Sequence, residues 1–182
     1  ALSPLPPSSS AAISDTTVHD PWRPVPALGG HAAIPAGAFD RTSLDCRTDV
    51  LTYTSEPLSD NLHLTGEGFV LVYCTGDTPS FDLCAVLSDV QPGGGVYNFS
   101  QGYIRVESGQ STTPVKITLQ PTCICLARGH SLRLSLSAAC FPAYPVNAGT
   151  GKPPGETQLM DQQIITITVF SGSDRPSQVL LP

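Results

Sequence analysis

Charge is scarce in this 182-residue chain. Only 13% of its residues are Asp, Glu, Lys or Arg, half of the ~25% that is usual for soluble domains. The net charge is −6, the only lysines are Lys116 and Lys152, and no basic cluster occurs. Binding to nucleic acid or to an anionic membrane therefore has no electrostatic support. A surface this poor in charge suggests that part of it is covered by a partner or by the rest of a longer chain.

Long apolar runs are also absent. No run approaches the roughly 20 residues that a membrane helix needs. Residues 1–15 lack the basic region and apolar core of a secretory signal. We therefore expect a cytoplasmic protein, of bacterial origin, without a membrane partner. The single methionine is Met160, and because an unprocessed translation product begins with methionine, we expect a processed or excised piece.

Motifs of catalysis and of metal binding are missing as well. No Gly-x-Ser-x-Gly pentapeptide occurs, and the nearest fragment, 129–131, lies at the start of a predicted strand. No HExxH or EF-hand spacing is present. We thus predict no catalytic residue, no metal ligand and no cofactor in this chain. The histidines are scattered and are each predicted to lie on the surface or in a turn: His19, His31, His63 and His130.

Six cysteines are present, which would allow a disulfide framework. Such frameworks belong mainly to short secreted chains, so we expect free thiols instead. Cys74, Cys84 and Cys125 lie in apolar runs and are predicted to be buried. Cys123 and Cys125 resemble a metal chelate only superficially, because no second pair at zinc-finger spacing supports them.

Alternating apolar runs parted by turn residues make up most of the chain. In residues 81–90, Phe81 and Leu83 begin one apolar face, while Asp82 and Cys84 begin a mixed one. Such a strand is covered on one face and partly covered on the other, as near the centre of a sandwich. Asp82, with Asp77 and Asp89, is predicted to cap the neighbouring turns.

About nine or ten strands are predicted, with no βαβ unit and no helix beyond a turn near 157–162. The predicted strands span residues 50–54, 62–65, 69–74, 81–90, 96–106, 115–119, 123–126, 132–136, 164–170 and 179–181. The count and spacing predict an all-β fold, a two-sheet antiparallel jelly-roll sandwich of the galactose-binding-like kind. We place the sandwich domain at 47–182.

Two segments precede the sandwich. Residues 1–19 are rich in proline and serine without periodicity and are predicted to be a disordered linker or lead-in. Residues 20–46 are predicted to form an extended strap, since prolines at 21, 24 and 26 force an extended path. Trp22 would pin this strap to a folded surface, and Gly29 and Gly30 would form a bend.

The ordered series of short motifs resembles the C-terminal β-sandwich domain of the cocaine esterase and X-Pro dipeptidyl-peptidase family of serine α/β-hydrolases. Only the first 19 residues fall outside the resemblance. The matching stretches include 20–21, 24–30, 39–41, 47–58, 64–66, 81–82, 87–90, 92–93, 102–105, 129–134, 141–142, 147, 149–151 and 176–182.

The resemblance implies a non-catalytic domain, because the family's Ser-His-Asp triad lies on a preceding α/β-hydrolase domain. That catalytic domain is the implied partner, in a parent acting on ester, amide or peptide bonds by acyl transfer. The strap residues Trp22, Pro24 and Pro26 would dock on it. The residues implied to wall the substrate pocket are Leu28, Gly29, Gly30, His31 and Ile34.

Two other functions stay open at this point. A free-standing carbohydrate-binding sandwich would show exposed aromatic side chains aligned on one sheet face. A structural jelly roll that drives homo-oligomerisation would show a large apolar self-complementary interface.

Overall fold

The structure is a computed structural model, and it describes residues 1–5, 13–107 and 113–182. Eleven strands lie in these residues, and the ten predicted strands are all among them. The all-β class is confirmed. The described residues include no helix that is long and apolar enough to cross a membrane.

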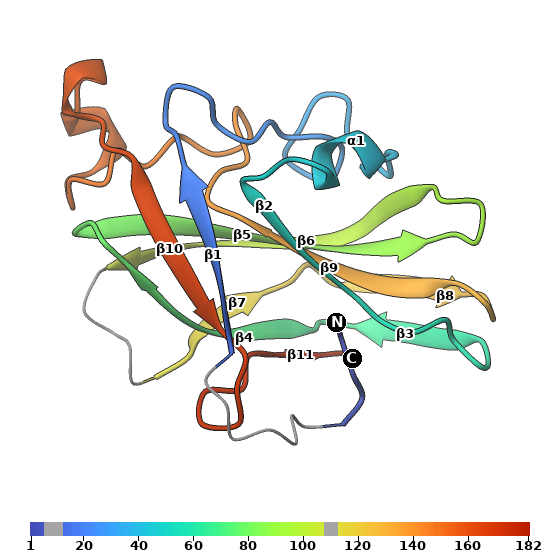
Figure 1. Cartoon of the computed structure of the whole chain (residues 1–182). Helices are drawn as coiled ribbons and strands as arrows, with labels where there is room; N and C mark the ends of the chain where they lie inside the picture. Colours follow the sequence, from blue (N-terminus) through green and yellow to red (C-terminus); the bar gives the residue numbers. More distant parts are fainter. Residues whose placement is uncertain (6–12, 108–112) are drawn as a thin grey trace.

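One sheet has five strands, all paired antiparallel (Figure 1). Its centre is β4, which pairs with β10 and then β11 along one edge and with β7 along the other. The strand β1 closes the sheet beside β10. The five strands are β1 (Ser14–His19), β4 (Phe69–Gly76), β7 (Val115–Thr118), β10 (Ile165–Phe170) and β11 (Gln178–Leu180).

The second sheet has four antiparallel strands in the order β2-β9-β5-β6. These are β2 (Val50–Thr54), β9 (Ser131–Ser137), β5 (Ser80–Val90) and β6 (Val96–Glu107). The hairpin β5–β6 carries a register shift between Leu87 and Ser88. A short ribbon of β3 (Leu62–Gly66) and β8 (Thr122–Leu126) extends the molecule at one end (Figure 1).

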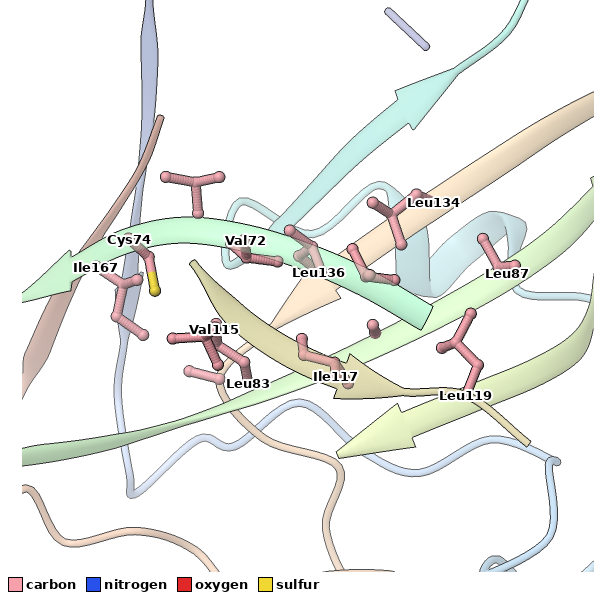
Figure 2. Packing of buried hydrophobic residues seen from close by; sticks show 14 of the residues in the cluster. Val72, Cys74, Leu83, Leu87, Val115, Ile117, Leu119, Leu134, Leu136 and Ile167 are labelled. Atoms are coloured by element: carbon pink, nitrogen blue, oxygen red, sulfur yellow. The ribbon is translucent and has the colours of Figure 1, made fainter. Parts of the chain in front are cut away.

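The two sheets enclose one main hydrophobic core. Val72 and Cys74 of β4 and Ile167 of β10 face Leu83 of β5 and Leu136 of β9 across it (Figure 2). Each of these strands alternates, so that every second side chain enters the core, as a sandwich requires. The largest fully buried side chains include Phe81, Leu64, Leu83, Leu87, Ile117, Leu119, Leu126, Ile165 and Ile167.

The strand β5 is buried on both of its faces. Its first nine residues, from Ser80 to Ser88, are all buried, which agrees with the prediction of a central strand. Its second face is covered by chain outside the sheets. That covering chain contains the one-turn helix α1 (Thr42–Asp45) and the 3-10 turns η1 (Pro154–Glu156) and η2 (Leu159–Asp161).

The predicted lead-in and strap need correction. Residues 14–19 are not disordered, because they form β1 and pair with β10 from Ser14↔Phe170 to His19↔Ile165. The alternation of Thr17 and His19 inward and Thr16 and Val18 outward supports this strand. The prediction for residues 6–12 lies outside the described residues. The strap is not extended throughout, since it contains α1 and a closed loop.

His19 was predicted to lie on the surface, and this was wrong. It is 1% exposed on the inner face of β1, and neither ring nitrogen has a hydrogen-bond partner among the described residues. Burial lowers the pKa of His19, against a smaller raising effect of the nearby Asp49 and Asp20 carboxylates.

Gly102 is required by the close approach of β6 and β7. A Cβ atom there would lie 2.2 Å from the Thr118 carbonyl oxygen and 2.9 Å from Ile117 Cγ2. We predict that Gly102→Ala lowers the free energy of unfolding by about 2–3 kcal/mol, because backbone must move to accept the methyl group. The matched control is Gly93→Ala, where nothing lies within 4 Å of the added atom. Urea unfolding of both variants checks this, and equal stabilities would contradict it.

The buried His19 predicts a stability that depends on pH. Below pH ~6.5 the unfolded imidazole takes up a proton, whereas the folded one stays neutral until its lower pKa is reached. Stability should therefore fall with decreasing pH, by at most about 1.4 kcal/mol per pH unit from this group. His19→Leu should remove that part of the slope in urea unfolding between pH 7.5 and 5. An unchanged slope in the variant would be inconsistent with this origin.

Candidate functional site

Two segments together cover the outer face of the four-stranded sheet. They are the strap, residues 20–46, and the long loop, residues 138–164, and we call them the cover layer. Both lie above the sheet in Figure 1. They pair with each other through a parallel bridge between Pro26 and Phe141, with Ala27 N–H donating to the Phe141 carbonyl at 2.7 Å and Phe141 N–H donating to the Val25 carbonyl at 3.0 Å.

Val25, and not Trp22, holds the strap on the sandwich. Val25 is 2% exposed and packs with Leu44 of α1, Val50 of β2 and Ala139. Trp22 is 50% exposed, so it does not hold the strap on this sandwich, and its docking on the catalytic domain stays a prediction. The sequence did not identify Val25 as the anchor, because the strap has no periodic pattern that distinguishes buried from exposed positions.

The segment after the anchor forms a closed loop. Gly30 and Gly37 exchange two backbone hydrogen bonds of 2.7 and 2.9 Å. Gly29 has φ +64°, and a Cβ on it would meet the Gly37 carbonyl oxygen at 2.4 Å, so this bend needs glycine. The side chain of Asn98 on β6 secures the loop, because it accepts from Phe39 N–H at 2.8 Å and donates to the Gly37 carbonyl at 3.2 Å.

Residues 98–100, Asn-Phe-Ser, match the sequon for N-glycosylation, and the structure shows whether Asn98 is accessible. It is buried at 3% exposure, with both its oxygen and its nitrogen engaged. The folded chain therefore does not present this amide to a modifying enzyme.

His31 stands at the exposed start of the closed loop and is supported from below by two tyrosines. Its Nε2 lies 3.2 Å from the Tyr144 hydroxyl, and its ring meets the Tyr144 ring edge-on at 6.4 Å. Tyr144 stacks on Tyr103 of β6, with ring centroids 4.0 Å apart and an interplanar angle of 2°. This stack fixes the position of Tyr144 and therefore that of the imidazole.

We call His31, Tyr144 and Tyr103 the column. A buried carboxylate contacts it at Tyr103, the end opposite His31. Asp82 of β5 accepts a hydrogen bond from the Tyr103 hydroxyl and another from Asn147 Nδ2 at 2.8 Å. Asn147 Oδ1 accepts from Ser80 at 3.0 Å and from Gly149 N–H at 2.9 Å. Asp82 therefore ties the long loop to the sheet, and its predicted role as a turn cap was wrong.

Burial sets the electrostatics of the column. It raises the pKa of Asp82, opposed by the hydrogen bonds from Asn147 and Tyr103 and by the Arg105 charge. Burial and the adjacent Asp82 raise the pKa of Tyr103, and burial also raises that of Tyr144. Both phenols therefore stay protonated at neutral pH, and that of Tyr103 donates its hydrogen bond to Asp82.

A second buried carboxylate ties the strap to the sheet. Asp45 of α1, whose side chain is 1% exposed, lies 3.6 Å from Arg41 and 3.4 Å from Arg133 of β9. Ser135 of β9 donates a hydrogen bond to it at 3.1 Å. Because a buried carboxylate needs opposite charge and hydrogen bonds, this network holds α1 in one position.

One histidine–carboxylate pair lies in the described part of the sandwich. His130 pairs with Asp89 through Nδ1 at 2.8 Å, which resembles two members of a triad. Within the residues that the structure describes, no serine, threonine or cysteine hydrogen-bonds the other ring nitrogen. Asp89 therefore pairs with the His130 ring and is not the turn cap predicted for it.

The predicted pocket-wall residues separate into two groups. Leu28, Gly29 and Gly30 are half-buried or buried and shape the bend, whereas His31 and Ile34 are exposed on the closed loop. Of the strap residues, Pro24 is half-buried and Pro26 is exposed. The supporting residues Tyr103, Tyr144, Asp82 and Asn147 were missed, because only the fold brings β5, β6 and the long loop together.

Removing the Asp45 charge tests the strap attachment. We predict that Asp45→Asn lowers the free energy of unfolding by about 2–4 kcal/mol, because two arginines lose their buried partner. The matched control is Glu107→Gln, which removes a charge from the exposed pair with Arg105 at 3.2 Å and should change stability by less than about 1 kcal/mol. Urea unfolding measures both, and a small effect of Asp45→Asn would contradict the proposed attachment.

Comparison with known proteins identifies the domain. The family model of the X-Pro dipeptidyl-peptidase C-terminal non-catalytic domain matches residues 2–180. Cocaine esterase of Rhodococcus sp. (strain MB1 Bresler) is 28% identical over 189 residues, covering 96% of this chain and 33% of that protein. The chain thus spans about a third of the length of this curated relative.

Two solved structures share the fold. An α-amino acid ester hydrolase superposes with a TM-score of 0.85 at 24% identity, over 98% of this chain and 34% of that one. An aminopeptidase from a marine sediment Thaumarchaeota archaeon gives a TM-score of 0.83 at 18% identity, over 97% of this chain and 34% of that one. From the match over residues 2–180, the chain belongs to the family of X-Pro dipeptidyl-peptidase C-terminal non-catalytic domains.

Proposed function

We propose that this domain packs through its cover layer against the catalytic domain of a serine hydrolase and helps to wall the substrate pocket. The parent would act on ester, amide or peptide bonds by acyl transfer. The observation that carries the proposal is the closed loop 30–37, which is rigidly supported at its base and exposes an apolar tip.

The exposed side chains of the cover layer support this packing. Ile34 at the tip of the closed loop is fully exposed, and Trp22 and Phe141 are each about half exposed, at 50% and 47%. Further along the long loop, Leu159 and Met160 are exposed as well. Exposed apolar side chains of this size are typical of surfaces that meet a partner, and the low overall charge suits a docked face.

His31 gives this surface one polar, oriented group. Its ring nitrogen is held by Tyr144, while the rest of the ring is exposed. At a pocket wall, such a group would offer a hydrogen bond to a substrate or to the catalytic domain. The role proposed for it is orientation and not proton transfer, because no serine, threonine or cysteine among the described residues hydrogen-bonds its ring.

No observation favours the carbohydrate-binding alternative. The exposed aromatic residues among those described are Trp22, Tyr97 and Phe141. Two of them lie in the cover layer, and only Tyr97 lies on a strand. They do not form the aligned row on one sheet face that this function predicts.

Oxidative side-chain footprinting tests the packing. We predict that hydroxyl radicals label Trp22, Ile34 and Phe141 in the 182-residue chain, and that all three are protected when the catalytic domain is joined to it. The reason is that a docked surface excludes both solvent and radical. Mass spectrometry of the labelled peptides measures the rates.

Leu181 provides the control, since it is exposed near the C-terminus, on the other side of the sandwich from the cover layer (Figure 1). Its labelling should not change. Protection of Leu181 with continued labelling of the closed loop would place the interface elsewhere and contradict the proposal.

A further inference from the structure

The ribbon β3–β8 brings a histidine and two cysteines to one exposed face. In its antiparallel register His63 lies directly opposite Cys125, and Thr65 lies opposite Cys123. All four side chains are exposed, while the alternate residues Leu64 and Leu126 are buried in the core. The prediction that Cys125 is buried was therefore wrong, because β8 presents it on the outer face.

The pair His63–Cys125 has the separation of two ligands on one metal ion. Cys125 Sγ lies 3.7 Å from His63 Nε2. A tetrahedral ion with a metal–sulfur bond of about 2.3 Å and a metal–nitrogen bond of about 2.05 Å sets these atoms about 3.6 Å apart. The two donor atoms thus need almost no movement to share an ion.

We propose that His63 and Cys125 form a surface chelate for a soft or borderline cation of the Zn²⁺ or Cu⁺ class. Thiolate and imidazole are the donors that these cations prefer over the oxygen donors that select Mg²⁺ or Ca²⁺. Binding forms a sulfur–metal bond and a nitrogen–metal bond, and the Cys125 thiol releases its proton to solvent. No oxidant or reductant takes part.

The site supplies two protein ligands. In the residues with described placement, no group of three or more His, Cys, Asp or Glu side chains gathers closely enough to enclose an ion. Cys123 faces Thr65, with Sγ 3.8 Å from the hydroxyl, and is not a ligand. The remaining coordination positions are open to water or to an external ligand such as a small thiol.

This inference is independent of the proposed packing. The ribbon lies at one end of the sandwich and the cover layer lies over the outer face of the four-stranded sheet (Figure 1). From the sequence, Cys123 and Cys125 were the only candidate ligands considered, and no second pair at zinc-finger spacing supports them. The cross-strand register supplies the imidazole, 62 residues away in the chain.

Titration of the chain with Co²⁺, under anaerobic conditions with a non-thiol reductant, tests the site. Co²⁺ reports sulfur ligation through thiolate charge-transfer absorption, and Zn²⁺ should displace it. We expect one ion per chain, bound more tightly as the pH rises. His63→Ala and Cys125→Ser should each weaken binding at least about tenfold.

Cys123→Ser is the matched control, because it removes an exposed thiol from the same strand and the same face without touching the pair. It should bind as the unmodified chain does. All three positions are exposed, so circular dichroism should show unchanged folding. Absence of sulfur ligation in the unmodified chain, unchanged binding in His63→Ala, or equal loss in Cys123→Ser would each overturn the proposal.

Discussion

The structure depends on covering the outer face of the four-stranded sheet. Two carboxylates are buried at this boundary, Asp82 on the sheet and Asp45 on α1 of the strap, because the strap and the long loop close over the sheet. A buried carboxylate is costly unless charge and hydrogen bonds compensate it. Arg41 and Arg133 compensate Asp45, while Tyr103 and Asn147 compensate Asp82. The cover layer and the sheet therefore stabilise each other.

Contacts between the sheet and the cover layer also position the surface that we propose for packing. Asn98 of β6 forms hydrogen bonds with both ends of the segment 37–39 at the end of the closed loop. The stacked rings of Tyr103 and Tyr144 hold His31 in place. We expect a loop with such supports to keep one conformation without a partner, so that little entropy is lost when it docks. Rigid support below and exposed apolar groups above are the two properties that a pocket wall needs.

Local patterns predicted the strands and the sandwich class, whereas the pairing of the strands and the contacts of the cover layer depend on the tertiary fold. The alternation in β5 indicated a strand covered on one face and partly covered on the other, and the structure buries both faces, including Asp82 and Cys84 on the mixed one. β1 was missed because its Thr17 and His19 are polar residues that face inward, against the usual pattern. Val25 was missed as the anchor because the strap has no periodicity, and the larger Trp22 was chosen instead. The pairing of His63 with Cys125 depends on a register between strands far apart in sequence.

Hydrogen exchange in the isolated chain tests most directly whether the cover layer is an integral part of the fold. The Ala27 and Phe141 amides, which join the strap to the long loop, are the reporters, and the β5 amides give the rate for global unfolding. The account predicts that both reporters exchange nearly as slowly as β5. Exchange of these two amides at rates typical of an open loop, with β5 still protected, would contradict it.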